Sequence, residues 1–273
     1  MAQKSRRKIK SSLAGNALVK IAIRVALVIA IITMLAYYHV IETVKDQSLN
    51  QLEKITLERT QRERQIFQLA EDNHVALKAE LIRRLSELGE SDPVAAFDKK
   101  VEQFPDGTYR TRIKGFDGKR ESFVYIGQNV EIDADLRRRV MTFIDLGEQY
   151  GAAWHHRLQN VYFTAPENFF AGYWPNVPDW AHRLPANMVF QEEEPVCVAD
   201  LEHNPSRESV WTGHFYDVGS KSWMTSLNTP VDVEGKQVAT IGHDITLNEL
   251  LERTISNHLD GAYNLIVRED GRL

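Results

Sequence analysis

Hydrophobic residues change their spacing along the chain, and the first pattern marks a membrane-spanning helix. Residues 18–41 are almost continuously apolar, and between Val25 and Val40 the only ionisable side chain is His39. A helix needs about 20 consecutive apolar residues to cross a bilayer. We therefore predict a transmembrane helix over residues 18–41. A cleaved signal peptide is the main alternative, but its apolar core would be shorter and would end in small residues, whereas bulky residues follow here.

The charges around this segment predict its orientation. Residues 1–41 contain no acidic side chain and seven basic ones, which are Lys4, Arg6, Arg7, Lys8, Lys10, Lys20 and Arg24. The cytoplasmic flanks of membrane helices are enriched in Lys and Arg. We therefore expect residues 1–17 in the cytoplasm and the chain after about residue 41 on the other side of the membrane. That outer part carries 26 basic and 38 acidic side chains, a balance that disfavours a nucleic-acid partner.

The next segment has the period of an amphipathic helix. Residues 42–88 contain no Pro or Gly, and their apolar positions are spaced by threes and fours or by sums of these, beginning Ile41, Val44, Leu52, Ile55, Ile66 and Leu69. Such a helix rising from a membrane can form a coiled-coil stalk, which predicts a homodimer through residues 42–90. The alternative, compatible with the first, is that the apolar stripe packs on the chain's own domain.

After the predicted stalk the elements become short. Alternating residues predict a hairpin of strands 109–116 and 122–128, then a helix over 133–150 and a strand over 154–164. Residues 165–208 contain six prolines and are expected to be irregular; they also hold the rings of Phe169, Phe170, Tyr173, Trp174, Trp180 and Phe190. A Pro-rich loop with aromatic residues beside a sheet suits a ligand lid. The rings could equally serve only to pin the loop to the sheet.

The last third of the chain predicts an antiparallel meander that leads into a helix. Residues 211–218, 223–229 and 238–245 are rich in aromatic and β-branched residues and are separated by turns. Thr246, followed three residues later by Glu249, forms a capping box that opens the helix. Together these patterns predict an α+β fold, in which a long N-terminal helix precedes an antiparallel sheet.

Three pieces of this meander resemble the distal end of a double-Cache sensor domain, the extracytoplasmic PAS-like module of bacterial receptors. They are Phe215-Tyr-Asp before a Gly-containing turn, the strand Ser226-x-Asn-Thr-Pro-Val, and the closing Gly242-His-Asp-Ile-Thr-Leu. The resemblance covers residues 42–273. It implies a signal-transduction input domain that binds a small molecule and controls a cytoplasmic output module, with a diguanylate cyclase favoured over a histidine kinase or a chemoreceptor signalling domain.

The resemblance also implies a division of the chain. The expected parts are a cytoplasmic basic tail (1–17), the transmembrane helix (18–41), the stalk helix (42–90), the membrane-distal sensor subdomain (91–259) and the start of a membrane-proximal subdomain (260–273). Because the sequence stops within an expected hairpin, the chain is interpreted as a fragment, and the output module as absent from it.

The residues expected to bind the ligand are Trp154, Tyr162, Trp174, Trp180, Arg207, Trp211, Asp217 and Asp244. In amino-acid-binding double-Cache domains an acidic residue at the end of the last distal strand contacts the ligand's amino group, and Asp244 matches that position. The Arg-x-Trp-Tyr element of that branch is replaced here by Arg207-Glu-Ser-Val-Trp. We therefore expect a small polar or anionic metabolite rather than an α-amino acid. From the residues alone, Arg207 could instead be a solvated loop charge, and Asp217 could cap the turn that follows it.

No catalytic constellation is recognisable in the sequence. There is no Gly-rich phosphate loop, and the adjacent His155 and His156 are expected to point to opposite faces of a strand. The single cysteine, Cys197, excludes a disulfide framework within one chain. We predict no cofactor and no metal site, and leave open whether the full-length protein is an enzyme. The alternatives to a sensor are an anchored dimerisation spacer and an extracytoplasmic enzyme or adhesin.

Overall fold

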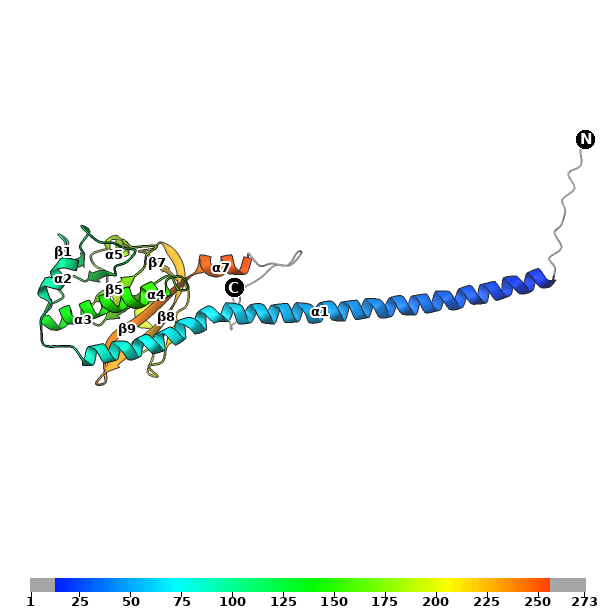
Figure 1. Cartoon of the computed structure of the whole chain (residues 1–273), viewed down its shortest axis with the longest axis horizontal. Coiled ribbons are helices and arrows are strands. Elements are labelled where there is room, and N and C mark those ends of the chain that lie inside the picture. Colours follow the sequence, from blue (N-terminus) through cyan, green and yellow to red (C-terminus); the bar gives the residue numbers. More distant parts are fainter. Residues whose placement is uncertain (1–12, 256–273) are drawn as a thin grey trace, which may run out of the picture. The chain divides into compact units, whose positions relative to one another are not determined.

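The computed structural model describes residues 13–255, and the chain divides into two compact units, Met1–Arg62 and Glu63–Leu273 (Figure 1). The basic tail up to residue 12 and the predicted subdomain start at 260–273 lie outside the described residues. The long N-terminal helix and the antiparallel sheet that follows it confirm the predicted α+β class.

Helix α1 (Leu13–Ser86) belongs to both units. Its residues up to Arg62 form the described part of the first unit. By length and composition it can cross a membrane, and no residue of its most apolar window is buried. Leu27, Ile32 and Leu35 are each more than half exposed; the transmembrane helix stays a prediction.

Within the second unit the same helix packs on the sheet. Ile66, Ala70, His74, Leu77 and Leu81 are buried, and their spacing of three and four residues places them on one face of the helix. The alternative interpretation, in which the apolar stripe packs on the chain's own domain, is thus confirmed for this part of the helix. The dimer stays a prediction.

The second unit is built on one antiparallel sheet, in the order β1-β2-β3-β5-β4-β9-β8-β6, with β7 also paired to β8. The strands are β1 (Val101–Gln103), β2 (Tyr109–Thr111), β3 (Phe123–Ile126), β4 (Val161–Ala165), β5 (Phe169–Tyr173), β6 (Val210–Trp211), β7 (Phe215–Asp217), β8 (Ser222–Val233) and β9 (Lys236–Thr246).

The helices of this unit are short apart from α1 and α3. They are α2 (Val94–Lys100), α3 (Ala134–Leu146), the π-helical turn η1 (Gly147–Gly151), α4 (Ala152–Trp154), α5 (Trp180–Arg183), the 3₁₀ turn η2 (Phe190–Glu192), α6 (Glu194–Cys197) and α7 (Leu247–Ile255). The predicted cap of α7 is present, since the N–H of Glu249 donates to Oγ1 of Thr246 at 3.3 Å.

The sheet has two apolar faces because consecutive side chains of a strand point to opposite sides. On one face, Val161 and Phe163 of β4 pack with Phe143 of α3 and with Leu77 and Leu81 of α1. Figure 1 shows α3 and the last turns of α1 lying along this face.

The other face of the sheet is covered by the segment of residues 174–197, which carries α5, η2 and α6. Tyr162 of β4 and Phe170 of β5 pack there against Trp180 and Phe190. Consecutive residues of a strand therefore pack in different cores, and only side chains on the same face of the sheet can contact each other.

Two predictions of local structure are wrong. Trp154 ends a helix rather than starting a strand, because Gly151 keeps a right-handed helical φ of −60° and the helix continues through it. Gly151 is required by packing, since a Cβ there would lie 2.5 Å from the Tyr173 ring. Residues 165–208 are not irregular throughout, because they contain β5, a central strand buried on both faces that shows no alternation.

Candidate ligand site

A cavity of about 50 Å³ lies between the sheet and the segment 174–197. Its wall is largely aromatic, with the rings of Phe123, Tyr162, Phe170, Tyr173, Trp174, Trp180, Phe190 and Phe215. Five of the eight predicted ligand residues line it, namely Tyr162, Trp174, Trp180, Asp217 and Asp244. The volume as it stands holds a few water molecules, so the ligand that fits it has few heavy atoms.

Asp244 of β9 is a buried carboxyl at the floor of the cavity. Its Oδ2 accepts a hydrogen bond from Nδ2 of Asn160 at 2.6 Å, and its Oδ1 accepts one from the Ser226 hydroxyl. Burial raises the pKa of Asp244 from 3.8 to about 7; these two hydrogen bonds oppose the rise and the negative charge of Asp217 adds to it. A buried carboxylate with no cation beside it is costly, which favours a positively charged ligand.

Asp217 of β7 is a second carboxylate on the cavity wall. Nε1 of the Trp180 indole lies 3.2 and 3.0 Å from its two oxygens, and the N–H of Ser220 donates to Oδ2 at 2.5 Å. Asp217 therefore caps the turn that follows it, as the simpler interpretation predicted, and also lines the cavity.

Glu193, just before α6, supplies a third carboxylate. Its side chain is exposed on the outer side, but partial desolvation raises its pKa, with further contributions from the negative charges of Asp217 and Glu192. The negative charge of Asp217 raises the pKa of both Glu193 and Asp244. Asp217 therefore repels each of the other two carboxylates electrostatically. None of the residues that line the cavity is Lys, Arg or His.

Trp174 adds a hydrogen-bond donor to this wall. Its ring is buried, and its Nε1 has no acceptor among the described residues. A buried N–H without a partner is unfavourable by about 1–3 kcal/mol. A ligand that also carries an acceptor oxygen would satisfy it.

The floor of the cavity depends on the glycine at position 242. Tyr162 lies across β9 there and donates from its hydroxyl to Oδ1 of Asn228 at 2.9 Å. A Cβ on Gly242 would lie 2.0 Å from Cζ of Tyr162. Only glycine allows the phenol to lie flat on the strand beside Asp244.

The other three predicted ligand residues lie elsewhere in the unit. Trp154 packs on the opposite face of the sheet, with its ring centroid 5.7 Å from that of His243. Trp211 packs edge-on against Phe67 at 4.9 Å, and its indole N–H donates to Glu71 at 3.0 Å. Trp211 therefore packs on α1 and Trp154 packs beside His243, and neither ring lines the cavity.

Arg207 is an anchor of the loop between α6 and β6. Its guanidinium donates to both oxygens of Asp232, at 2.7 and 2.6 Å, and to the carbonyl of Ala199 at 2.9 Å. With these donors engaged and its side chain outside the cavity wall, Arg207 is not placed to hold an anion in the cavity. The sequence motif that carried the anionic expectation thus has a structural role here.

The face opposite the cavity carries two buried histidines. Nε2 of His74 on α1 lies 2.7 Å from Nδ1 of His243 on β9, and Nδ1 of His74 lies 2.6 Å from Oγ1 of Thr229. Burial lowers the pKa of His243 to about 3, and burial together with His243 lowers that of His74. His243 directly precedes Asp244 in β9. The residue that contacts α1 and the residue at the floor of the cavity are therefore neighbours in one strand.

Sequence reasoning missed Glu193 and misplaced His155. Glu193 belongs to a run of three glutamates that reads as a solvated segment, and only the fold turns one of them toward the cavity. His155 follows α4, and its ring lies 3.8 Å from that of His156, so the expectation that the two rings point to opposite faces of a strand is wrong.

No family model matches the chain, and no curated protein matches it. Among solved structures, the ligand-binding domain of the Pseudomonas fluorescens chemoreceptor CtaA with L-valine is 19% identical, with a TM-score of 0.33 over 41% of this chain and 46% of that domain. That of the Pseudomonas aeruginosa chemoreceptor PctB with L-Arg is 14% identical, with a TM-score of 0.35 over 43% and 45%. That of PctC with GABA is 14% identical, with a TM-score of 0.42 over 78% and 67%. All three are chemoreceptor ligand-binding domains, and this chain spans less than half the length of the first two.

Proposed function

We propose that the second unit is the input domain of a membrane-anchored receptor and that its cavity binds a small organic cation. The observation that carries this proposal is the charge of the cavity wall. Three carboxylates line it, together with aromatic rings, and no basic side chain among residues 13–255 does so. Aromatic faces attract cations through their quadrupoles, so the rings and the carboxylates favour the same ligand charge.

The ligand class follows from the same wall. An ammonium group would lower the free energy of the charged form of Asp244, which burial disfavours. A ligand carboxylate would add a fourth negative charge to a wall that offers no guanidinium. We therefore infer an organic amine of few heavy atoms. It carries either no other polar group or a neutral oxygen that accepts a hydrogen bond from the indole N–H of Trp174.

The strand that carries Asp244 also offers a route for the signal. A ligand on the cavity side changes the charge state at Asp244, while the adjacent His243 contacts His74 of α1 on the other side. A ligand shifts a conformational equilibrium only through different affinities for the two states. We infer that the two states differ in the packing of α1 against β9.

We further propose the topology implied by the resemblance to double-Cache domains. Residues 18–41 would cross the inner membrane, with the basic tail in the cytoplasm and the second unit in the periplasm. The stalk helix would dimerise, and a cytoplasmic output module, a diguanylate cyclase by preference, would receive the signal.

A matched set of three-carbon compounds tests the ligand class. The full chain in detergent is screened by thermal shift at pH 8 against propylamine, propionate, 3-aminopropanoate and 3-aminopropanamide. A compound that binds only the folded state stabilises it by about 2.7 kcal/mol at one hundred times its Kd. We expect a shift with the two cations and a smaller or no shift with the zwitterion and the anion.

The variant Glu193→Gln, compared with Glu192→Gln, tests whether this cavity is the site. Both side chains are exposed, but Glu193 lines the cavity and its neighbour Glu192 does not, so only the first change should reduce the shift with propylamine. A larger shift with propionate than with propylamine would contradict the proposal.

A further inference from the structure

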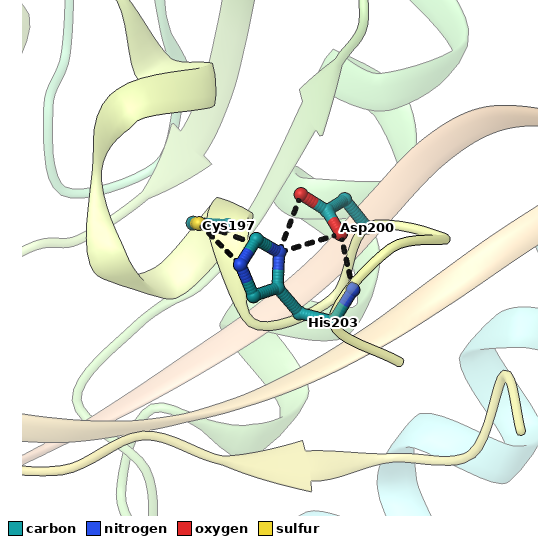
Figure 2. A group of neighbouring side chains, drawn as sticks. All are labelled: Cys197, Asp200 and His203. Atoms are coloured by element: carbon teal, nitrogen blue, oxygen red, sulfur yellow. Dashed lines mark hydrogen bonds and ion pairs between the residues drawn. The ribbon is translucent and has the colours of Figure 1, made fainter. Parts of the chain in front are cut away.

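Outside the cavity, three side chains of different chemistry converge on the loop that follows α6. Cys197, Asp200 and His203 offer ligand atoms that lie within 4.8 Å of one another. Figure 2 shows the His203 ring between the Cys197 sulfur and the Asp200 carboxylate, with all three residues on one short segment. The sulfur of Cys197 lies 3.7 Å from Nδ1 of His203, and that nitrogen lies 2.9 and 3.0 Å from the oxygens of Asp200.

Two of these separations can be compared with those of a tetrahedral zinc site. Zinc binds thiolate sulfur at about 2.3 Å and imidazole nitrogen at about 2.05 Å, which places the two ligand atoms about 3.6 Å apart. The observed distance between the Cys197 sulfur and the His203 nitrogen is 3.7 Å. The corresponding nitrogen–oxygen separation is about 3.3 Å, against 2.9 and 3.0 Å between Nδ1 of His203 and the oxygens of Asp200.

The arrangement differs from that of a nucleophilic Cys-His-Asp relay. In a relay the carboxylate holds one ring nitrogen and the nucleophile faces the other. Here the sulfur is nearer to Nδ1 at 3.7 Å than to Nε2 at 3.9 Å, and Asp200 contacts Nδ1 as well. The sulfur does not face the ring nitrogen opposite the one that Asp200 contacts, as a relay requires, and none of the three residues lines the cavity.

The loop that carries these ligands is held in place without a metal. The N–H of Asp200 donates to the carbonyl of Cys197 at 3.2 Å, and that of Asn204 donates to the carbonyl of Asp200 at 2.9 Å. Arg207, anchored by Asp232, donates to the carbonyl of Ala199 within the same loop. The ligands are thus pre-positioned, and the exposed His203 ring leaves access from solvent.

We propose that Cys197, Asp200 and His203 form a Zn²⁺ site with a fourth position open to water. A thiolate, an imidazole and a carboxylate form a mixed set of soft and hard ligands that suits zinc rather than magnesium or calcium. This proposal departs from the expectation of no metal site, which followed from a single cysteine and from adjacent histidines expected to point apart. Because α6 also carries Pro195 and Val196 of the cavity wall, zinc would fix that wall.

Metal titration of the full chain in detergent tests the site. After treatment with a chelator, the protein is titrated with Co²⁺ and then with Zn²⁺ at pH 7.5. We expect one equivalent of Co²⁺ to produce a thiolate-to-metal charge-transfer absorption that Zn²⁺ abolishes. Cys197→Ser should lose this absorption, and His203→Gln and Asp200→Asn should each weaken Zn²⁺ binding at least tenfold.

The control is the double variant His155→Gln and His156→Gln, which removes two adjacent exposed imidazoles that are not part of the proposed site. It should bind zinc as the parent does. Thermal unfolding of each variant without metal checks that it folds. Absence of the absorption in the parent chain, or equal zinc affinity in Cys197→Ser, would overturn the proposal.

Discussion

The substitution Asp244→Asn should make the ligand-free protein more stable, although it removes a group proposed to bind the ligand. The carboxyl has a pKa of about 7 in the folded protein against 3.8 ordinarily. A raised folded-state pKa means that the stabilising contribution of the protonated carboxyl is complete below about pH 4 and is lost as the pH rises to about 7. This difference of about three pKa units corresponds to about 4 kcal/mol.

Asparagine keeps the shape of the side chain and removes the titration. One of the hydrogen bonds from Asn160 and Ser226 has to reverse its direction, which the Ser226 hydroxyl can do at a cost of about 1 kcal/mol. We therefore expect the variant to be about 3 kcal/mol more stable than the parent at pH 8 and within about 1 kcal/mol of it at pH 5. For a unit of about 200 residues, this corresponds to a rise in Tm of about 6–12 °C at pH 8.

The assay is thermal unfolding of the full chain in detergent between pH 5 and pH 8.5, read as the difference between variant and parent. Other titrating groups contribute equally to both proteins and cancel. The control is Asp232→Asn, because Arg207 lowers the pKa of Asp232 by hydrogen bonding; this variant should lose stability at pH 8. If Asp244→Asn were less stable than the parent at pH 8, or if its advantage did not change with pH, the reasoning would be refuted.

Two further predictions concern the two faces of the sheet. The pKa values of His74 and His243 are lowered by burial, so the stability they contribute is present above about pH 6.5 and is lost as the pH falls below it, by about 1.4 kcal/mol per residue and pH unit. In the Asp244→Asn background, the double change His74→Gln and His243→Gln should reduce the slope of Tm between pH 6.5 and 5, and an unchanged slope would exclude these histidines as its source. Gly242→Ala should destabilise the protein by about 1–3 kcal/mol in denaturant unfolding, because its Cβ displaces Tyr162. Gly89→Ala, with nothing within 4 Å, is the control, and equal effects of the two changes would contradict the account of the cavity floor.

Much of the fold could be predicted because the spacing of apolar residues and the residues that form turns are local features of the sequence. The spacing of Ile66, Leu77 and Leu81 predicted a helix face, and the alternation in β8 and β9 predicted the meander. The strand β5 was missed because it is buried on both sides and has no alternation to reveal it. The helix through Gly151 was missed because a packing contact with Tyr173, far away in the sequence, decides its conformation.

Part of the candidate site was predictable, from a residue's place in a strand or, for Trp174 and Trp180, from the aromatic residues of the Pro-rich segment. Asp244 and Tyr162 face the cavity because alternation in neighbouring strands places them on one side of the sheet. Arg207 was assigned to an anion because its type suits one, but its partner Asp232 lies 25 residues away and could not be inferred from spacing. The inferred ligand therefore changed from a small polar or anionic metabolite to the proposed organic cation, because of the carboxylates that line the cavity.

The central claim is that the cavity binds a cation, and the most direct test is isothermal titration calorimetry of propylamine and of propionate with the full chain at pH 8. We expect saturable binding of propylamine at one site, at least tenfold tighter than that of propionate, and loss of this binding in Asp244→Asn, whose fold is monitored by its raised Tm. Equal or tighter binding of propionate, or propylamine binding that persists unchanged in Asp244→Asn, would contradict it.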